Sequence, residues 1–258
     1  MPLVLNVIGI GRKSGKTSLI ESMTRELTER KYKVSTIKHI SKGSFDTAQK
    51  DTWKHLEAGA EEVIALSPRE MVSIKRISEP LLDMAVEEVG EDSDLILVEG
   101  FKKTGYRKII AAQTLEEAKE LVKTIEEVLA ISGPISETIE LKLFKGIPIL
   151  EPRELTSKIE EMILENMVKR LPKLNCKKCG YDSCGALAQA ILRKEASIDH
   201  CKSLLDEEVI LMVNGKRVFL SEFPKNFMRN TVLGMVNSLK GVEREKSRKI
   251  SLSINLER

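Results

Sequence analysis

Apolar residues in the first two-thirds of the chain fall into short runs separated by longer amphipathic stretches. Runs typical of buried strands occupy residues 4–9, 34–39, 63–66, 95–98, 128–132 and 147–150. Helical spacing of apolar positions marks residues 16–30, a segment through Trp53 and Leu56 to Gly59, and residues 79–89, 115–125 and 153–169. Such alternation is typical of a parallel sheet covered on both faces. We therefore expect an α/β fold with a mostly parallel sheet and flanking helices.

The pattern changes after Leu171-Pro172. It predicts a short helix at residues 185–195 and a hairpin with strands at 209–213 and 216–220. Asn214-Gly215 is a dipeptide favoured in the type I′ turn of such a hairpin. A helix at 225–239 and an alternating strand at 250–254 follow. We therefore expect two domains, residues 1–170 and 171–258, the second a small α+β module.

Charge and composition narrow the function classes. The net charge is +3, but residues 171–258 carry 16 basic against 10 acidic side chains. This excess indicates either ordinary surface variation or docking to an acidic partner or ligand. An aromatic content of 4% argues against a platform for single-stranded nucleic acid. The amino terminus lacks a basic leader, and no apolar run approaches the ~20 residues that span a bilayer. We expect a cytoplasmic protein that binds neither nucleic acid nor membrane.

A candidate phosphate loop follows the first predicted strand. Gly-Lys-Thr-Ser opens the next helix, where free N–H groups, the lysine and the threonine hydroxyl suit phosphates and Mg²⁺. The first glycine of the usual pattern is replaced by Ile10, which Gly9 and Gly11 flank. An ordinary strand–helix turn is the alternative. The predicted phosphate-binding residues are Gly11, Arg12, Lys13, Ser14, Gly15, Lys16, Thr17 and Ser18.

An acidic residue is expected near the metal, at the end of a neighbouring buried strand. Glu99 ends the run that begins at residue 95 and precedes Gly100. We expect it to bind Mg²⁺ or its water shell, with capping of a nearby turn as the alternative. Lys16, Thr17 and Glu99 are then the candidate catalytic residues for slow hydrolysis by charge neutralisation. No Asn-Lys-x-Asp motif is present, so the motifs do not specify which base is bound.

All four cysteines of the chain lie within 26 residues, as Cys176-x2-Cys179-x4-Cys184-x16-Cys201. Four thiolates suit either zinc or a [4Fe–4S] cluster. Because a single pair has the spacing of a zinc knuckle, we favour the cluster, with zinc and uncoordinated thiols as alternatives. His200 is expected to be an exposed neighbour. The segment from Leu171 onward resembles the four-cysteine iron–sulfur domain of corrinoid iron–sulfur proteins and electron-transfer subunits.

Three segments of residues 3–165 together resemble the MobB family, adaptors of molybdopterin-guanine dinucleotide biosynthesis. They are residues 11–19, residues 36–60 with Lys38-His39, Phe45-Asp46, Lys50-Asp51 and Ala58-Gly59-Ala60, and residues 97–102. The resemblance implies GTP binding, weak GTP hydrolysis and a homodimer. It also implies partnership with the MobA-like guanylyltransferase that attaches GMP to the metal-bound pterin, with the pterin cofactor or its insertase as further partners. It places Lys38, His39, Asp46 and Asp51 on the nucleotide or pterin side.

The chain also departs from the family pattern. Gly43 or a neighbour stands where the family has a second histidine, and the usual Gly-Lys-Asp is Gln49-Lys50-Asp51. Gly133 replaces an acidic residue after a later strand, which leaves base specificity open. His39 could instead satisfy a local carbonyl, while Asp46 and Asp51 could be a loop residue and a helix N-cap.

The sequence therefore predicts a GTP-binding adaptor with an iron–sulfur module, whose enzymatic activity is at most a slow GTPase. An alternative is a nucleotide-gated electron-transfer or redox-sensing module unrelated to pterins. A third reading treats the cluster as a structural staple for a small domain.

Overall fold

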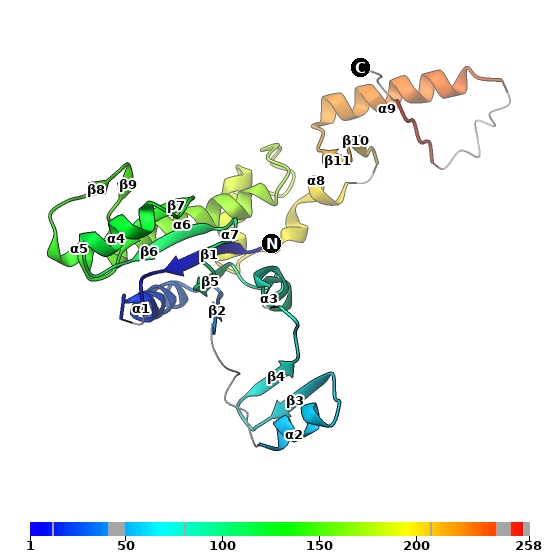
Figure 1. Cartoon of the computed structure of the whole chain (residues 1–258). Coiled ribbons are helices and arrows are strands. Elements are labelled where there is room, and N and C mark those ends of the chain that lie inside the picture. Colours follow the sequence, from blue (N-terminus) through cyan, green and yellow to red (C-terminus); the bar gives the residue numbers. More distant parts are fainter. Residues whose placement is uncertain (12, 41–49, 80, 207, 241–248, 255–258) are drawn as a thin grey trace. The chain divides into compact units, whose positions relative to one another are not determined.

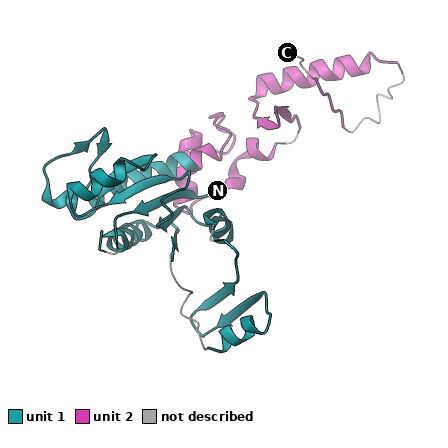
Figure 2. Ribbon diagram, viewed as in Figure 1, with its two compact units in different colours: residues 1–166 teal, residues 167–258 magenta. Residues whose placement is uncertain are grey.

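The computed structural model describes residues 1–11, 13–40, 50–79, 81–206, 208–240 and 249–254. The chain forms two compact units, residues 1–166 and 167–258 (Figure 2). Helix α6 (Pro152–Lys169) runs across this division. Among the described helices, none is long and apolar enough to cross a membrane. The division into domains of residues 1–170 and 171–258, which the sequence analysis expects, stays a prediction.

Unit 1 is built around a five-stranded sheet in which every pairing is parallel (Figure 1). The spatial order is β2-β5-β1-β6-β7. The expected α/β fold with a mostly parallel sheet is confirmed. The strands are β1 (Leu3–Ile8), β2 (Val34–Lys38), β5 (Leu95–Glu99), β6 (Arg107–Ala111) and β7 (Val128–Ser132).

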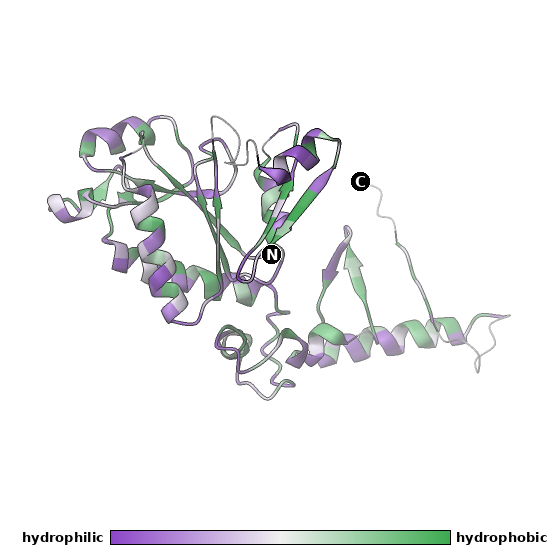
Figure 3. Cartoon of the chain, turned by 90° about the horizontal axis from the view of Figure 1, so that it is seen from below, coloured by the Kyte–Doolittle hydropathy of each residue, from purple (hydrophilic) through white to green (hydrophobic). Residues whose placement is uncertain are grey.

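Helices cover the sheet because its strands alternate apolar side chains to both faces. On one face, Val4 and Ile96 pack with α3 (Leu82–Val89), and Ile8 packs with α4 (Leu115–Val122). Helix α1 (Lys16–Glu29) packs against β1, β2 and β5. Figure 3 shows hydrophobic strands in the sheet and helices that also carry hydrophilic residues. Strands of a parallel sheet that is covered on both faces can carry apolar side chains on both faces.

Strand β6 is a correction to the sequence analysis, which predicts no strand there. Its apolar run is short, and it is preceded by Arg107 and Lys108. The structure nevertheless buries Lys108, which is 4% exposed, beside the fully buried Ile109 and Ile110. Because a charged residue stands inside this strand, its apolar run is too short to predict a strand from the sequence.

The predicted strand at residues 63–66 exists, but it does not join the parallel sheet. It is β3 (Glu62–Leu66), which pairs antiparallel with β4 (Met71–Lys75), a strand that the sequence analysis missed. Helix α2 (Asp51–Glu57) packs on this hairpin. The run predicted at 147–150 is likewise part of a short hairpin. The remaining elements of unit 1 are α5 (Ile135–Thr138), β8 (Leu143–Phe144) and β9 (Ile147–Pro148).

Unit 2 contains α7 (Cys184–Leu192), a 3₁₀ turn (Ile198–His200), α8 (Lys202–Leu205) and α9 (Glu222–Asn237). The predicted hairpin is confirmed as β10 (Leu211–Val213) and β11 (Lys216–Val218). Its turn residues Asn214 and Gly215 have φ of 50° and 74°, as a type I′ turn requires. The strand predicted at 250–254 is wrong for the described residues, since alternation forms a strand only where a partner strand pairs with it.

The sheet packing predicts an asymmetry between two isoleucines. Ile110 is fully buried, so Ile110→Ala should lower the free energy of unfolding by about 2–5 kcal/mol, because it removes packed methylenes and leaves a cavity. Ile64 on β3 is 56% exposed, so Ile64→Ala should change it by less than about 0.5 kcal/mol. Urea titration of both variants measures the difference. Equal losses would contradict the assigned core.

Candidate functional site

The loop between β1 and α1 depends on three glycines. Gly11 and Gly15 have φ of 66° and 83°, values that favour glycine. A Cβ on Gly9 would lie 2.7 Å from the Ala111 carbonyl oxygen, and one on Gly15 would lie 3.0 Å from Pro134 Cδ. The loop therefore needs a glycine at residue 9, directly before Ile10.

The Lys16 side chain folds back over this loop. Its Nζ donates hydrogen bonds to the Gly11 carbonyl oxygen at 2.6 Å and to Ser14 Oγ at 2.7 Å. Partial burial lowers the pKa of Lys16, and the positive charges of Lys102 and Lys38 lower it further, while Glu99 opposes them. Two further ammonium groups and the carboxylates of Glu99 and Glu117 therefore act on Lys16. Such a site attracts a polyanion.

Thr17, Lys38 and Glu99 converge at the same edge of the sheet. The Thr17 hydroxyl donates to Glu99 Oε2 at 3.1 Å, and Lys38 Nζ lies 3.4 Å from the same oxygen. The register causes this meeting, since Glu99 pairs with Val7 on β1 and with Lys38 on β2. A hydroxyl beside a carboxylate, with lysines around them, can hold a divalent cation and the phosphates that it neutralises.

His39 follows Lys38 and stacks on the Phe101 ring. The ring centroids are 4.3 Å apart, and the planes are inclined by 27°. The His39 backbone N–H donates to the Glu99 carbonyl oxygen at 3.0 Å. Gly100 lets the two segments approach, because a Cβ there would lie 3.0 Å from His39 Cβ. His39 is thus held at the same edge as Glu99.

The other predicted site residues are placed as follows. Lys13 and Ser18 are exposed on the phosphate loop and the first turn of α1. Asp51 lies in the first turn of α2, where it is 87% exposed and pairs with Lys54 at 2.9 Å. Lys50 precedes it as the N-cap, so Asp51 is not the N-cap. Arg12 and Asp46 lie outside the described residues.

Sequence reasoning missed three residues near this site. Asn6 is fully buried in β1, Lys108 is buried in β6, and Lys102 is exposed on the loop between β5 and β6. The signal for Asn6 was available, since it is a polar residue inside the apolar run of β1. Lys102 ends residues 97–102, one of the segments that carry the family resemblance, so a signal for it was available as well.

The four cysteines line one small cavity in unit 2, together with Tyr181, Leu187 and Ser203. The loop that carries the first two is shaped by residues in the left-handed region, among them Asn175 and Gly180. Asn175 Oδ1 accepts a hydrogen bond from the Cys184 backbone N–H at 2.8 Å. This bond ties the loop to the first residue of α7. The fold therefore brings all four predicted ligands to one cavity.

The surroundings of these thiols differ. Cys201 is buried, and burial raises the pKa of its thiol. Burial also acts on Cys176, but the Ser203 hydroxyl, 3.1 Å from its sulfur, and backbone N–H groups outweigh burial and lower its pKa. His200 is exposed, and its Nδ1 accepts a hydrogen bond from the Ser197 backbone N–H at 3.0 Å. This local role accounts for His200 without metal ligation.

In the described part of the chain, no three His, Cys, Asp or Glu side chains are arranged to hold a single metal ion. Cysteines from four separate positions nevertheless line the cavity of unit 2. Four thiols around one space are a donor set that suits an iron–sulfur cluster.

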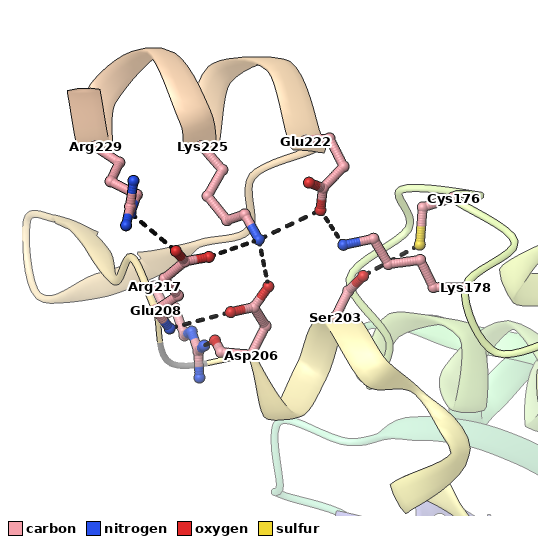
Figure 4. A network of polar contacts seen from close by, with 9 residues as sticks. All are labelled: Cys176, Lys178, Ser203, Asp206, Glu208, Arg217, Glu222, Lys225 and Arg229. Atoms are coloured by element: carbon pink, nitrogen blue, oxygen red, sulfur yellow. Dashed lines mark hydrogen bonds and ion pairs between the residues drawn. The ribbon is translucent and has the colours of Figure 1, made fainter. Parts of the chain in front are cut away.

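A polar network surrounds Lys225 on α9, beside the cysteine loop (Figure 4). Lys225 Nζ lies 2.9 Å from Asp206, 3.2 Å from Glu208 and 3.3 Å from Glu222. Glu222 also pairs with Lys178 of the cysteine loop. A hydrogen bond from Lys225 lowers the pKa of Asp206, and the Asp206 hydrogen bond in turn raises the pKa of Lys225. This network joins α9 to the segments around the cysteines.

The network predicts an acid-sensitive unit 2. The folded-state pKa of Asp206 is below its ordinary value of 3.8, so its contribution to stability is present above that pH and is lost as pH falls through the folded value. Lys225→Met should lower the melting temperature of unit 2 near neutral pH and flatten its fall in acid. The exposed Lys216→Met is the matched control and should do neither. Calorimetry of both variants across pH measures this, and identical profiles would contradict the prediction.

Comparisons with known proteins agree with this geometry. The family model "Molybdopterin guanine dinucleotide synthesis protein B" (MobB) matches residues 4–133, and "Putative Fe-S cluster" matches residues 171–203. A Methanocaldococcus jannaschii protein, "Putative molybdopterin-guanine dinucleotide biosynthesis adapter protein", is 26% identical over 255 residues, which cover 98% of each chain. The Haemophilus influenzae "Molybdopterin-guanine dinucleotide biosynthesis adapter protein" is 35% identical over 122 residues, 46% of this chain and 68% of that protein.

A solved structure supports the fold of unit 1. The crystal structure of Bacillus subtilis MobB aligns with 62% of this chain and 97% of its own, with 21% identity and a TM-score of 0.51. The family match covers the phosphate loop, Lys38, His39 and Glu99, and the second match covers all four cysteines. The chain belongs to the MobB family of molybdopterin guanine dinucleotide synthesis proteins and carries, after its MobB region, a segment of an Fe–S cluster family.

Proposed function

We propose that unit 1 binds GTP with Mg²⁺ and that the chain acts as an adaptor for the guanylyltransferase that attaches GMP to the metal-bound pterin. The observation that carries this proposal is the convergence of Lys16, Thr17, Lys38 and Glu99 at the end of β1 and β5. The two relatives are named as adapter proteins of molybdopterin-guanine dinucleotide biosynthesis, which supports the adaptor role.

Each residue then has a defined role. Lys16 would leave the Gly11 carbonyl and Ser14 to reach the β- and γ-phosphates, since phosphate oxygens are stronger acceptors for an ammonium. Thr17 would ligate Mg²⁺, with Glu99 on the metal or on its bound water. These charges would support slow hydrolysis by neutralising the transferred phosphoryl group. His39, stacked on Phe101, would line the nucleotide or pterin side.

We propose a [4Fe–4S] cluster on Cys176, Cys179, Cys184 and Cys201, with zinc as the alternative. The shared cavity supports this proposal. The cluster would supply one-electron chemistry or a structural staple. The Ser203 hydroxyl beside Cys176 would donate a hydrogen bond to the ligating sulfur, and such bonds tune the potential of a cluster.

Three finer expectations complete the proposal. The chain would act as a homodimer. Nucleotide binding would belong to residues 1–170, since the phosphate loop and Glu99 both lie there. The cluster would belong to residues 171–258, where all the cysteines lie.

The phosphate-loop assignment predicts the effect of removing one ammonium. Lys16→Ala should abolish binding of Mg²⁺-GTP, because it removes the ammonium group that would contact the β- and γ-phosphates, while the melting temperature stays close to that of the wild type. The exposed Lys123→Ala at the end of α4 is the control and should bind normally. Isothermal titration calorimetry measures both variants. A Lys16→Ala variant that binds within a few-fold of wild type would refute the loop assignment.

The cysteine assignment predicts the metal content. Protein purified without oxygen should contain about four iron and four sulfide per chain and absorb broadly near 400 nm. Cys184→Ser should lose most of this iron, whereas Ser197→Ala, beside a local turn, should keep it. Iron and sulfide analysis gives the result. Stoichiometric zinc instead of iron would identify the site as a structural zinc site and contradict the cluster assignment.

A further inference from the structure

The loop after Glu99, residues 100–106, is held from inside the sheet by a buried amide. Asn6 is fully buried in β1, and its Nδ2 donates to the Gly100 carbonyl oxygen at 3.0 Å and to the Phe101 carbonyl oxygen at 3.1 Å. Gly100 and Phe101 have φ of 102° and 53°, both in the left-handed region. Such a turn is unfavourable for phenylalanine and needs support from its surroundings. Asn6 supplies that support.

A buried lysine holds the other end of this loop. Lys108 Nζ donates to the Thr104 carbonyl oxygen at 2.6 Å and to the Tyr106 carbonyl oxygen at 2.8 Å. The register pairs Asn6 with Lys108, so both side chains rise from the same face of the sheet. The Thr104 hydroxyl closes the arrangement with a hydrogen bond to the Phe101 carbonyl at 3.3 Å. Two neighbouring polar side chains thus fix both ends of one loop.

Burying these groups costs stability. Asn6 Oδ1 is buried without a hydrogen-bond partner in the described residues, although both amide hydrogens are used. An unpaired buried acceptor is unfavourable, and an apolar side chain at residue 6 would avoid it. Sequence positions that break a packing rule in this way are concentrated at functional sites. The shape of the loop, rather than the core, therefore accounts for Asn6.

The loop carries Lys102 toward the phosphate site. Lys102 is exposed and follows Glu99 by three residues, directly after Phe101, whose ring stacks on His39 at the edge that carries Lys38 and Glu99. Thr17 and Glu99 would hold the metal, which would neutralise the charge of the phosphates beside it. Because the loop begins directly after Glu99, it would lie beside the terminal phosphate of a nucleotide whose metal Glu99 holds.

We propose that Lys102 binds the γ-phosphate and that Asn6 and Lys108 are positioning residues that pre-form the loop which presents it. The site then distinguishes a nucleoside triphosphate from a diphosphate. This inference rests on the proposed nucleotide binding and adds to it the residues that recognise the terminal phosphate.

The test compares the affinities for GTP and GDP, each with Mg²⁺, in the full-length chain by isothermal titration calorimetry. Lys102→Met should reduce the preference for GTP over GDP about tenfold, the effect of losing one charge-assisted hydrogen bond. Lys102→Arg should restore most of it. Asn6→Val and Lys108→Met should reduce the same ratio while leaving GDP affinity within a few-fold. Lys103→Met removes the same charge from the next residue and should keep the ratio unchanged.

Each opposing result has a defined meaning. If Asn6→Val and Lys108→Met weaken GTP and GDP by the same factor, the two residues are merely structural and the positioning role is refuted. If either buried variant fails to fold, the exposed Lys102→Met decides, and an unchanged ratio there overturns the inference. A wild-type chain that binds GTP while every variant keeps its ratio contradicts this inference alone. A wild-type chain that binds neither nucleotide contradicts the proposed function and this inference with it.

Discussion

β1 and β5 pair in parallel with Val7 opposite Glu99, so the loop after β1 and the carboxylate that ends β5 emerge at the same edge of the sheet. β2 pairs with β5 on its other side and adds Lys38 at the same level. A shift of either register by one residue would turn Glu99 to the opposite face and separate it from Thr17. The apolar residues that pin these registers are therefore also what assembles the charged site.

Both units use a buried or nearly buried lysine to fix a loop near a functional centre. In unit 1, Lys108 binds two carbonyl oxygens of the loop after Glu99. In unit 2, Lys225 gathers three carboxylates, and one of them reaches the cysteine loop through Lys178. A lysine in such a position is costly unless every partner is satisfied, so each arrangement specifies one geometry of the loop that it holds. Rigid loops of this kind suit sites that must bind a ligand without reorganising.

The sequence predicted the elements whose apolar pattern agrees with their burial. β1, β2, β5, α1 and the Asn214-Gly215 turn follow from periodicity and turn chemistry. It failed for β6, where Lys108 interrupts the apolar pattern, and for β4, the antiparallel partner that keeps β3 out of the parallel sheet. The nearby groups Lys16, Thr17 and Glu99 were predictable because loop and strand-end motifs specify them. Lys102 follows Glu99 by three residues, but no loop or strand-end motif assigns it a role.

The edge of the sheet formed by β1, β2 and β5 is proposed to bind a nucleoside triphosphate with Mg²⁺. A crystal structure of the chain with Mg²⁺ and a non-hydrolysable GTP analogue tests this binding most directly. In the structure, Lys16 Nζ donates hydrogen bonds to the Gly11 carbonyl oxygen and to Ser14 Oγ. In the complex, Lys16 should have exchanged these partners for β- and γ-phosphate oxygens, with Thr17 Oγ1 on the metal and Glu99 on the metal or its bound water. A nucleotide bound elsewhere, with Lys16 still on Gly11 and Ser14, would contradict the account.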